Sequence, residues 1–577
     1  MINIKEHPQL SVLNHSCAHL MAQAISVLYP HAQFWVGPVI TDGFYYDVDL
    51  SEDVLTESDL VKIEKEMKKL SKDGKRIVRE EVSKEEAIKL FAHDKYKQDL
   101  LSNMNDDDAV ISIYRQGDWM DLCKGPHVET TKQMKNFKLL KVSGAYWKGD
   151  ANNQMLQRVY GICFETPEDL QAHLDWLEEA KKRDHKKLGR ELGLFMLSEY
   201  GPGFPFWLPD GMTLRKILED FWWDEHVKEE YQFIQTPTML SQDLWQVSGH
   251  WENYRENMYT SEIDDRKFAI KPMNCPGGML VYGQGLHSYK ELPLRIGELG
   301  LVHRHEASGA LNGLFRVRAF TQDDAHIFMR EDQIESEVVR LIHFIDRFYA
   351  IFGLTYTIEL STRPEKFIGE IAMWDKSEEA LKQACTAAGK AYKINPGDGA
   401  FYGPKLDFHI KDSLNRVWQC GTIQLDMNLP SRFDLSYIDS DGSKKEPIML
   451  HRVIFGSVER FIGILIEHYA GAFPLWMSPK QISLLPVNPE IHGDFVRDVQ
   501  AKLSQKGYRV VVDDRNEKLG YRIREAQIKK IPIQCVIGDQ EVENNEVNVR
   551  RYGQKQASNM ILEDFVSMID HEVASKS

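Results

Sequence analysis

Residues 294–328 read LRIGELGLVHRHEASGALNGLFRVRAFTQDDAHIF, and this stretch decides the fold of the largest part of the chain. Apolar residues typical of strands stand on both sides of a glycine-containing segment, which predicts two strands joined by a turn. A guanidinium pairs with phosphate or carboxylate through two hydrogen bonds and stays charged at any working pH. The stretch therefore predicts a hairpin that directs arginines at one anionic ligand, although exposed arginines without a ligand are the alternative. Those arginines are Arg295, Arg304, Arg316 and Arg318.

The composition is that of an ordinary globular protein. Its 577 residues are 42% hydrophobic and 27% charged, and they allow about four domains at roughly 150 residues each. The first residues lack the apolar stretch of a signal peptide, and the longest apolar runs are too short to span a bilayer. We therefore expect a cytoplasmic protein with no membrane partner. The net charge of -16 does not favour a general nucleic-acid binder, although it leaves room for a local basic face.

Four regions follow one another along the chain. The first mixes helical stretches with short strands, among them 44–49 and 111–116. Thr166 and Pro167 then read as the N-cap and first residue of a linker helix, because proline presets the first turn. The basic run KKRDHKK near its end is either a solvated face or one that faces RNA. The last region alternates strands and helices, which predicts a β-α-β-α-β module with a largely parallel sheet. The regions span 1–165, 166–190, 191–477 and 478–577.

Common catalytic motifs are missing from the sequence. It has no GxxxxGK[ST], no GxGxxG after a strand, no HExxH and no GxSxG, so phosphate-loop, dinucleotide-binding, zincin and serine-hydrolase functions lack their minimum residues. Seven cysteines without a CxxC pair argue against a disulfide framework and favour free thiols or isolated metal ligands.

Three stretches together resemble a known family. The run from Arg304 to Phe328, with RHE, SGAL, RVR and FTQDDAHIF, resembles the second signature motif of class II aminoacyl-tRNA synthetases, in the form found in threonyl-tRNA synthetases. HRVIFGSVERFIGILIEHYAG, at 451–471, resembles the third motif, with Gly456 opening an amphipathic helix. The long helix expected before FIQTPTML resembles the first motif, which builds the dimer interface in this class. The resemblance covers nearly the whole chain from His15 onward.

The resemblance implies a multidomain α+β and α/β protein. It comprises an N-terminal α+β editing domain, a class II antiparallel-sheet catalytic domain and a C-terminal α/β anticodon-binding domain. The implied activity is ATP-dependent ligation of L-threonine to tRNA-Thr through threonyl-adenylate, by a homodimer with Mg²⁺ bound to ATP. The matching ATP-site residues are Arg304 for the α-phosphate and the amino acid carboxylate, Glu306 for the adenine amino group, Arg316 and Arg460 for the outer phosphates, and Phe320 for stacking on adenine.

Members of this family hold one zinc ion per subunit through one cysteine and two histidines. The matching positions are Cys275, His326 and His451, which spacing alone would not identify. A site that must bind the threonine hydroxyl rejects valine strongly, whereas serine lacks only a methyl group and is rejected weakly. A second, hydrolytic site is therefore expected. The residues expected beside the amino acid are Gln322, Asp324, Tyr402, Gln419 and Gln424.

The N-terminal region supplies residues suited to ester hydrolysis. His15 and His19 are four residues apart, which places them on one face of a helix, and Cys123 and His127 repeat that separation. From the residues alone, a zinc site and a set of unrelated polar residues remain open alternatives. The resemblance implies instead a pocket that deacylates seryl-tRNA, generally without metal. Asp121 helps to shape that pocket, and Lys97 is a further candidate.

The C-terminal region matches the family's anticodon-binding domain. Asn516, Glu541 and Arg550 occupy positions that would read unstacked bases through their hydrogen-bonding edges. The rival functions are a synthetase-like regulator that binds tRNA without charging it and a free-standing deacylase. The first is disfavoured because the ATP-site residues are present, and the second because it would leave the rest of the chain unexplained.

The sequence departs from the family pattern in two respects. Family members usually begin with a small ubiquitin-like domain, whereas about fourteen residues precede HSCAH here, so we expect a short form, natural or truncated. Gly278 and Asn312 stand where histidine is usual, and Ala319 stands where glycine is usual. None of these changes removes an expected metal ligand or phosphate-binding arginine, so we expect aminoacylation to be retained.

Overall fold

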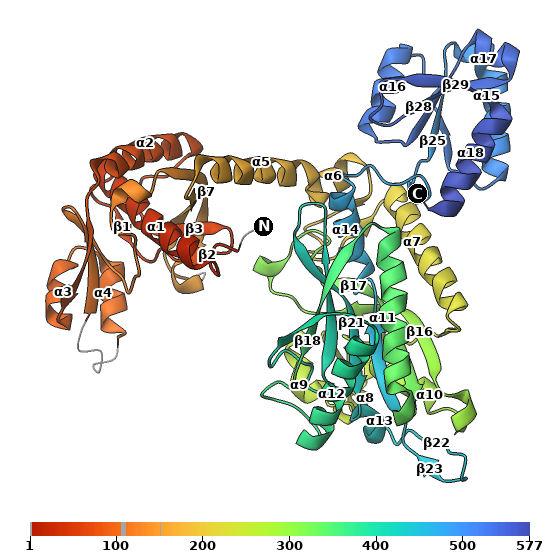
Figure 1. Cartoon of the computed structure of the whole chain (residues 1–577), viewed down its shortest axis with the longest axis horizontal. Helices are drawn as coiled ribbons and strands as arrows, with labels where there is room; N and C mark the ends of the chain where they lie inside the picture. The colour runs from red at the N-terminus through yellow and green to blue at the C-terminus, as the bar shows by residue number, and fades with distance from the viewer. Residues whose placement is uncertain (1–2, 105–110, 151, 577) are drawn as a thin grey trace. The chain divides into compact units, whose positions relative to one another are not determined.

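The computed structural model describes residues 3–104, 111–150 and 152–576. The chain divides into two compact units between Glu179 and Ala180 (Figure 1). Unit 1 holds the N-terminal region, and unit 2 holds the rest of the chain.

Unit 1 is built on an antiparallel sheet with the strand order β1-β3-β8-β7, and β2 pairs with β3. Helices α1 (Pro8–Leu28) and α2 (Glu57–Asp73) pack their buried faces into the same core as this sheet. Pro8 starts α1, and the His7 side chain accepts a hydrogen bond from the Leu10 amide, which caps the helix. The strands are β1 (Gln33–Phe34), β2 (Val39–Ile40), β3 (Gly43–Asp49), β7 (Asn136–Tyr146) and β8 (Met155–Phe164).

A second, smaller sheet in unit 1 has the strand order β4-β5-β6. It shares a small apolar core with two short helices, in which Ala87, Phe91 and Ile113 are buried. The strands expected at 44–49 and 111–116 are present as parts of β3 and β5. The elements are β4 (Ile77–Val82), α3 (Lys84–Leu90), α4 (Lys95–Ser102), β5 (Ile111–Gln116) and β6 (Trp119–Leu122).

Two helices occupy the region where one linker helix was expected. α5 (Pro167–Arg183) begins as expected, because the Thr166 hydroxyl accepts a hydrogen bond from the Asp169 amide at 3.1 Å. α6 (His185–Glu191) is a separate helix, since the Asp184 carboxylate accepts from the amides of Lys186 and Lys187 and caps a new N-terminus. The sequence pattern did not distinguish this internal cap from a solvated turn of helix.

The large sheet of unit 2 has the strand order β11-β16-β17-β24-β21-β20-β18-β19. Its pairs are antiparallel except β11 with β16 and β18 with β19. The predicted hairpin is confirmed as β16 (Leu294–His303) and β17 (Ala319–Met329). The other strands are β11 (Gln232–Phe233), β18 (Thr355–Ser361), β19 (Tyr392–Asn395), β20 (Lys405–Lys411), β21 (Val417–Asp426) and β24 (Ile448–Val453).

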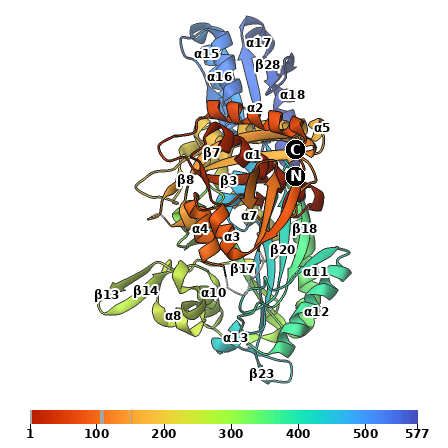
Figure 2. The ribbon, with the colours of Figure 1, turned by 90° about the vertical axis from the view of Figure 1, so that its left-hand side faces the viewer.

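Four helices pack around this sheet and fill its core. α11 (Ile334–Ile351) and α12 (Ile371–Ala387) lie side by side along it (Figures 1 and 2). α7 (Pro209–Lys228) and α14 (Val458–His468) contribute apolar residues to the same core. The expectation that Gly456 opens the last helix is wrong by two residues, because the Ser457 side chain caps it by accepting from the Arg460 amide.

Shorter elements complete this part of unit 2. They are β9 (Phe195–Met196), β10 (Phe206–Trp207), β12 (Met239–Ser241), α8 (Gln242–Val247), α9 (His250–Tyr254), β13 (Thr260–Ile263), β14 (Arg266–Ile270), α10 (Cys275–Tyr282), β15 (His287–Ser288), α13 (Leu429–Arg432), β22 (Tyr437–Ile438) and β23 (Lys444–Lys445).

The last sheet has the strand order β26-β25-β27-β28-β29 and is mixed. β25, β26 and β27 run parallel, as expected, but β28 and β29 are antiparallel, so a largely parallel sheet is only half right. Residues 538–545 join β27 to β28, which is too short for a parallel crossover. The elements are β25 (Ile482–Pro486), α15 (Pro489–Gln505), β26 (Val510–Val512), α16 (Leu519–Ile528), β27 (Ile533–Ile537), α17 (Asp539–Asn544), β28 (Glu546–Arg551), β29 (Ala557–Ile561) and α18 (Leu562–Ser575).

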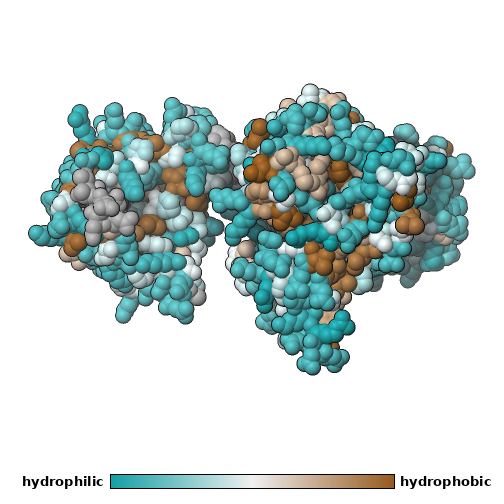
Figure 3. All heavy atoms as spheres, turned by 90° about the horizontal axis from the view of Figure 1, so that it is seen from below, coloured by the Kyte–Doolittle hydropathy of each residue, from teal (hydrophilic) through white to brown (hydrophobic). Residues whose placement is uncertain are grey.

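The face seen in Figure 3 is mainly hydrophilic, with separate apolar patches. Among the residues described above, no helix combines the length and the apolar character needed to cross a bilayer.

Candidate active sites

The hairpin of β16 and β17 brings Arg304 against the ring of Phe320. Arg304 directly follows β16, Phe320 is the second residue of β17, and the guanidinium carbon lies 5.1 Å from the ring centroid. Tyr254 offers a second ring, 5.6 Å from the same carbon. The Arg304 Nε donates to the Pro272 carbonyl at 3.2 Å. The arginine is thus held at one edge while its other donors remain available for an anion.

Two further arginines lie around the turn of the same hairpin. Arg316 donates from Nε to Glu306 Oε2 at 3.0 Å, and its side chain is 55% exposed. Arg460, in the first turn of α14, donates from Nε to the Phe315 carbonyl at 3.1 Å and from Nη1 to the Gln419 carbonyl at 3.3 Å. The structure therefore brings Glu306, Arg316 and Arg460, which the resemblance assigns to ATP, to one loop.

Two of the four hairpin arginines do not point at a shared ligand, which corrects the sequence prediction. Arg295 donates from Nε to Glu337 on α11 at 3.0 Å and is nearly buried, so its charge is satisfied within the fold. Arg318 donates to the carbonyls of Glu306 and Pro202, so it fastens the loop. Sequence spacing did not reveal either set of contacts.

Three potential metal ligands converge although they are distant in the sequence. His326 on β17 and His451 on β24 are register partners in the sheet, and Cys275 begins α10. One ligand atom from each lies within 4.8 Å of the others, and all three residues are buried. His451 Nε2 lies 2.9 Å from Asp426 Oδ2, which leaves its Nδ1 to face an ion.

The electrostatics of this cluster suit a soft or borderline cation. Burial raises the pKa of the Cys275 thiol well above its usual value. Burial, with repulsion from His451, lowers the pKa of His326 to about 3. His326 Nε2 is buried, and the described part of the chain offers it no hydrogen-bond partner. One sulfur and two imidazole nitrogens form a typical zinc donor set, so the residues present fit such an ion.

A cavity of about 330 Å³ opens beside Cys275 and His451. Four of the five residues expected beside the amino acid line it, namely Gln322, Asp324, Tyr402 and Gln424. Tyr402 donates from its hydroxyl to Gln424 Oε1 at 3.1 Å. Gln419 lies outside this lining; its side chain donates to Asp407 Oδ1 at 2.7 Å, next to the Arg460 loop.

Several residues of this site were not expected from the sequence. Asn274 donates to Asp324 Oδ2 at 3.2 Å, and its position beside Cys275 in KPMNCPG was a usable signal. His250 lies with Nε2 3.8 Å from Cys275 Sγ, and Asp426 contacts His451. No feature of the sequence marks His250 or Asp426, because strand register and a short helix bring them in.

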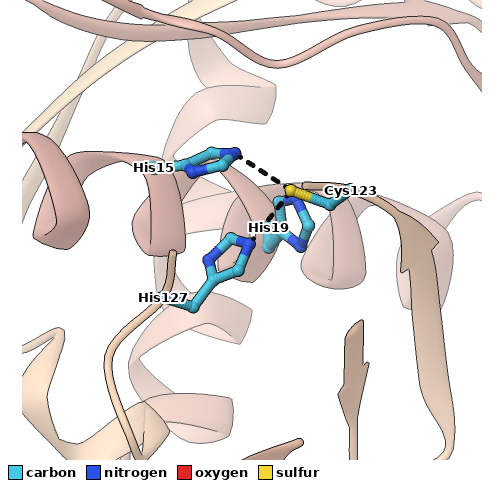
Figure 4. Close-up of side chains that lie close together, drawn as sticks. All are labelled: His15, His19, Cys123 and His127. Atoms are coloured by element: carbon cyan, nitrogen blue, oxygen red, sulfur yellow. Dashed lines mark hydrogen bonds between the residues drawn. The ribbon is translucent and has the colours of Figure 1, made fainter. Parts of the chain in front are cut away.

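In unit 1, His15 and His19 on α1 converge with Cys123 and His127 from the segment after β6 (Figure 4). Cys123 Sγ lies 3.3 Å from His15 Nε2 and 3.2 Å from His127 Nε2. The His127 ring centroid lies 4.3 Å from those of both other histidines. The expectation that His15 and His19 share one helix is confirmed, and four potential ligands or bases lie together in one cluster.

Burial sets the protonation states of the side chains in this cluster. It lowers the pKa of His15, His19 and His127, so these imidazoles are neutral near pH 7. Burial also raises the pKa of the Cys123 thiol to about 11, so the sulfur is protonated. The group set is thus uncharged. Because a lowered pKa makes these imidazoles weak bases, they suit the positioning of a water molecule better than its deprotonation.

A buried ion pair lies next to this cluster. Lys97 Nζ lies 2.6 Å from Asp121 Oδ1, and Asp121 Oδ2 lies 3.5 Å from His19 Nε2. Tyr46, on the strand at 44–49, donates its hydroxyl to Asp121 and accepts from Lys97 at 3.0 Å. Lys97 and Asp121 therefore stand where they were expected, and Tyr46 is a member that the sequence did not indicate.

The three residues expected to read bases lie on separate elements of the C-terminal sheet region. Asn516 is exposed on the segment before α16, and Arg550 is on β28. Glu541, on α17, accepts from the Gly538 amide at 2.9 Å and from Asn559 Nδ2 at 3.4 Å. Its carboxylate therefore also holds the helix start.

The three departures from the family pattern have defined surroundings. A Cβ on Gly278 would lie 3.0 Å from His326 Nδ1, so this glycine packs closely on the metal cluster. Asn312 accepts from Lys186 Nζ at 3.1 Å. Ala319 pairs with His303 at the start of β17.

Comparisons with known families match three parts of the chain. Residues 259–469 match the "tRNA synthetase class II core domain (G, H, P, S and T)", and residues 481–572 match the "Anticodon binding domain". Residues 111–160 match the "Threonyl and Alanyl tRNA synthetase second additional domain". With the antiparallel sheet and its arginine-bearing hairpin, these matches define a class II aminoacyl-tRNA synthetase.

Individual relatives agree over nearly the whole length. The threonine–tRNA ligase of Fusobacterium nucleatum is 56% identical over 98% of this chain and 92% of its own, and that of Acetivibrio thermocellus is 55% identical over 97% and 88%. The chain belongs to the threonine–tRNA ligase family. Among solved structures, the RNA binding domain of threonyl-tRNA synthetase from Cryptosporidium parvum matches with a TM-score of 0.66 and 38% identity, over 67% of this chain and 98% of that one.

Proposed function

We propose that this chain ligates L-threonine to tRNA-Thr through threonyl-adenylate and hydrolyses seryl-tRNA at a second site. The observation that carries this proposal is the cavity in which Cys275, His451, Arg304 and Asp324 meet. A carboxylate that attacks the α-phosphorus of ATP needs no protein nucleophile, only positioning and neutralised charge. Arg304 supplies that charge next to the amino acid site.

The remaining ATP contacts follow from the hairpin. Phe320, whose ring contacts Arg304, would stack on adenine, and Glu306 would accept from the adenine amino group. Arg316 and Arg460 bind the outer phosphates, with Mg²⁺ as the counterion of ATP. Glu306 pairs with Arg316 in the structure, so ATP binding exchanges this exposed pair for contacts with the nucleotide.

Cys275, His326 and His451 would hold the zinc ion of the threonine site. Such an ion would bind the amino and hydroxyl groups of threonine and so exclude valine, which lacks the hydroxyl. Asp324, Tyr402 and Gln424 line the cavity and orient the substrate by hydrogen bonds. Asn274 in turn orients Asp324.

Seryl-tRNA hydrolysis is assigned to the pocket of unit 1. Its neutral imidazoles suit the positioning of the attacking water by hydrogen bonds, and the Lys97–Asp121 pair lies next to His19. We assign editing to 1–165, linkage to 166–190, aminoacylation to 191–477 and anticodon binding to 478–577. Asn516, Glu541 and Arg550 are the proposed base contacts.

Homodimer formation is proposed at α7. Met212, Trp223 and Val227 are spaced to share one face of this helix, and each is exposed by 46–54%. Large apolar side chains grouped on an exposed helix face are typical of an interface. Analytical ultracentrifugation of the full chain tests this assignment, since a Trp223→Glu variant is expected to shift the dimer to monomer.

Pyrophosphate exchange tests the main proposal. Exchange is expected with threonine, weakly with serine and at background with valine. When tRNA-Thr is aminoacylated with serine, the wild-type protein is expected to leave no stable seryl-tRNA. The His19→Ala variant is expected to accumulate it. A chain that binds tRNA-Thr but gives no threonine-dependent exchange would instead be a non-charging regulator.

A further inference from the structure

Helix α6 contacts the turn of the β16–β17 hairpin through His185. This side chain is 1% exposed, and its Nε2 lies 3.0 Å from the backbone nitrogen of Leu314 in the turn. Its Nδ1 lies 2.7 Å from Oε1 of Glu467, in the last turn of α14. One buried imidazole therefore joins the linker region, the hairpin turn and the helix that carries Arg460.

The two hydrogen bonds define the tautomer of His185. The Leu314 N–H can only donate, so Nε2 must accept and the ring proton sits on Nδ1, where it is donated to Glu467. Glu467 Oε1 also accepts from the His185 amide at 2.9 Å, and Arg416 pairs with Oε2. The carboxylate thus holds the imidazole in the one tautomer that can accept from the turn.

The turn is shaped around this ring. Gly313 has a φ of +51°, a backbone conformation that favours glycine. A Cβ there would also lie 2.1 Å from His185 Nε2, so both the backbone conformation and the lack of space exclude a side chain. The Phe315 ring packs on the imidazole with centroids 3.9 Å apart. Asn312 and Arg316 exchange backbone hydrogen bonds of 3.1 and 3.3 Å across the turn.

The same turn contains or contacts both arginines assigned to the outer phosphates. Arg316 is part of it, and Arg460 is fastened to it through the Phe315 carbonyl, one residue after Leu314. A displacement of Leu314 would therefore move the anchor of Arg460 and the backbone of Arg316 together. A shift of about 1 Å in a positioning group costs as much as roughly a hundredfold in rate.

We propose that His185, held by Glu467, is a positioning residue for ATP: it fixes the turn at 312–316 and thereby sets Arg316 and Arg460. This inference rests on the proposed function, because that function assigns the two arginines to ATP. His185 does not line the cavity beside Cys275 and His451, and its effect passes through the Leu314 amide.

Two substitutions separate this role from packing. His185→Phe keeps a planar ring in the core and loses both hydrogen bonds, whereas His185→Gln offers an amide oxygen near the place of Nε2. Leu188→Ala is the matched control, since it removes a buried apolar side chain from the same helix without touching a polar contact. The readouts are kcat and KM for ATP and threonine in threonine-dependent pyrophosphate exchange, with Tm measured in parallel.

We expect His185→Phe to lower kcat/KM for ATP by about ten- to a hundredfold, with the KM for threonine within about twofold of wild type. His185→Gln should recover most of that loss, and Leu188→Ala should lower Tm while kcat/KM for ATP is retained. A folded His185→Phe variant with unchanged kcat/KM for ATP overturns the proposal, and so does a His185→Gln variant no better than Phe.

Glu467→Met serves where the His185 variants do not fold. It keeps a side chain of similar length but removes the oxygen that accepts from His185 Nδ1, so the tautomer is no longer held. The same fall in kcat/KM for ATP is expected, and an unchanged value overturns the proposal. Wild-type protein without any threonine-dependent exchange would contradict the proposed function instead, so the two failures are distinguishable.

Discussion

His326 and His451 stand opposite each other on the antiparallel strands β17 and β24, with their ring centroids 5.2 Å apart. Register, and not spacing along the chain, makes them a pair. A slip of one residue would turn one imidazole to the other face of the sheet and destroy the cluster. Cys275 at the start of α10 supplies the third ligand atom.

Asp426 is expected to control metal affinity without touching the ion. In Asp426→Asn the amide oxygen can still accept from the Asn428 and Leu429 amides, but the charge facing His451 Nε2 is lost. We expect zinc affinity to fall by about ten- to a hundredfold. Competition with a chelator, followed by metal analysis, measures the change, and unaltered affinity would show that Asp426 does not support the ligand.

Arg316→Ala is expected to weaken ATP binding while it leaves the stability of the fold nearly unchanged. The Arg316–Glu306 pair is exposed, so its removal should change the free energy of unfolding by about 1 kcal/mol or less. Pyrophosphate exchange, in contrast, should show a KM for ATP raised by about tenfold or more, because a charged contact to phosphate is lost. Equal ATP kinetics in the variant and the wild type would remove Arg316 from the ATP site.

The editing pocket should show little pH dependence near neutrality. Burial lowers the pKa of His15, His19 and His127, so their neutral forms persist at pH values below the usual pKa of 6.5. Deacylation of seryl-tRNA, corrected for uncatalysed hydrolysis, should keep its rate from pH 8 to pH 6. A rate that halves near pH 6.5 would indicate an essential histidine with an ordinary pKa.

Lys97→Met should destabilise unit 1, because it leaves the buried Asp121 without its cation. Breaking such a pair costs about 3 kcal/mol or more. Lys95→Met is the control: Lys95 pairs with Asp49, but its side chain is 58% exposed, so the expected cost is below about 1 kcal/mol. Amide hydrogen exchange of α1 in the full chain compares the two variants, and equal protection in both would contradict the account.

Much of the architecture could be predicted from local patterns. The alternation of apolar residues around 294–328 gave the hairpin, and the four-residue spacing of His15 and His19 gave one helix face. Thr166 gave a helix start. These features depend on neighbours in the sequence, where periodicity and capping chemistry act directly.

Contacts between distant segments could not be predicted in this way. Arg295 looked like the other hairpin arginines, yet Glu337 on α11 neutralises it. The antiparallel β28 and β29 depend on the short connection after β27. Tyr46 joins the proposed editing site only because β3 brings its hydroxyl to Asp121 and Lys97. Each outcome is decided by tertiary packing that no short window of sequence contains.

Anomalous scattering at the zinc edge, from crystals of the full chain grown with threonine, is the most direct test of how this protein selects its amino acid. The account predicts one zinc per chain, about 2.0–2.3 Å from Cys275 Sγ and from one nitrogen each of His326 and His451, with the threonine hydroxyl on the ion. A threonine-bound chain with no peak at that position, or with its only peak beside Cys123, would contradict it.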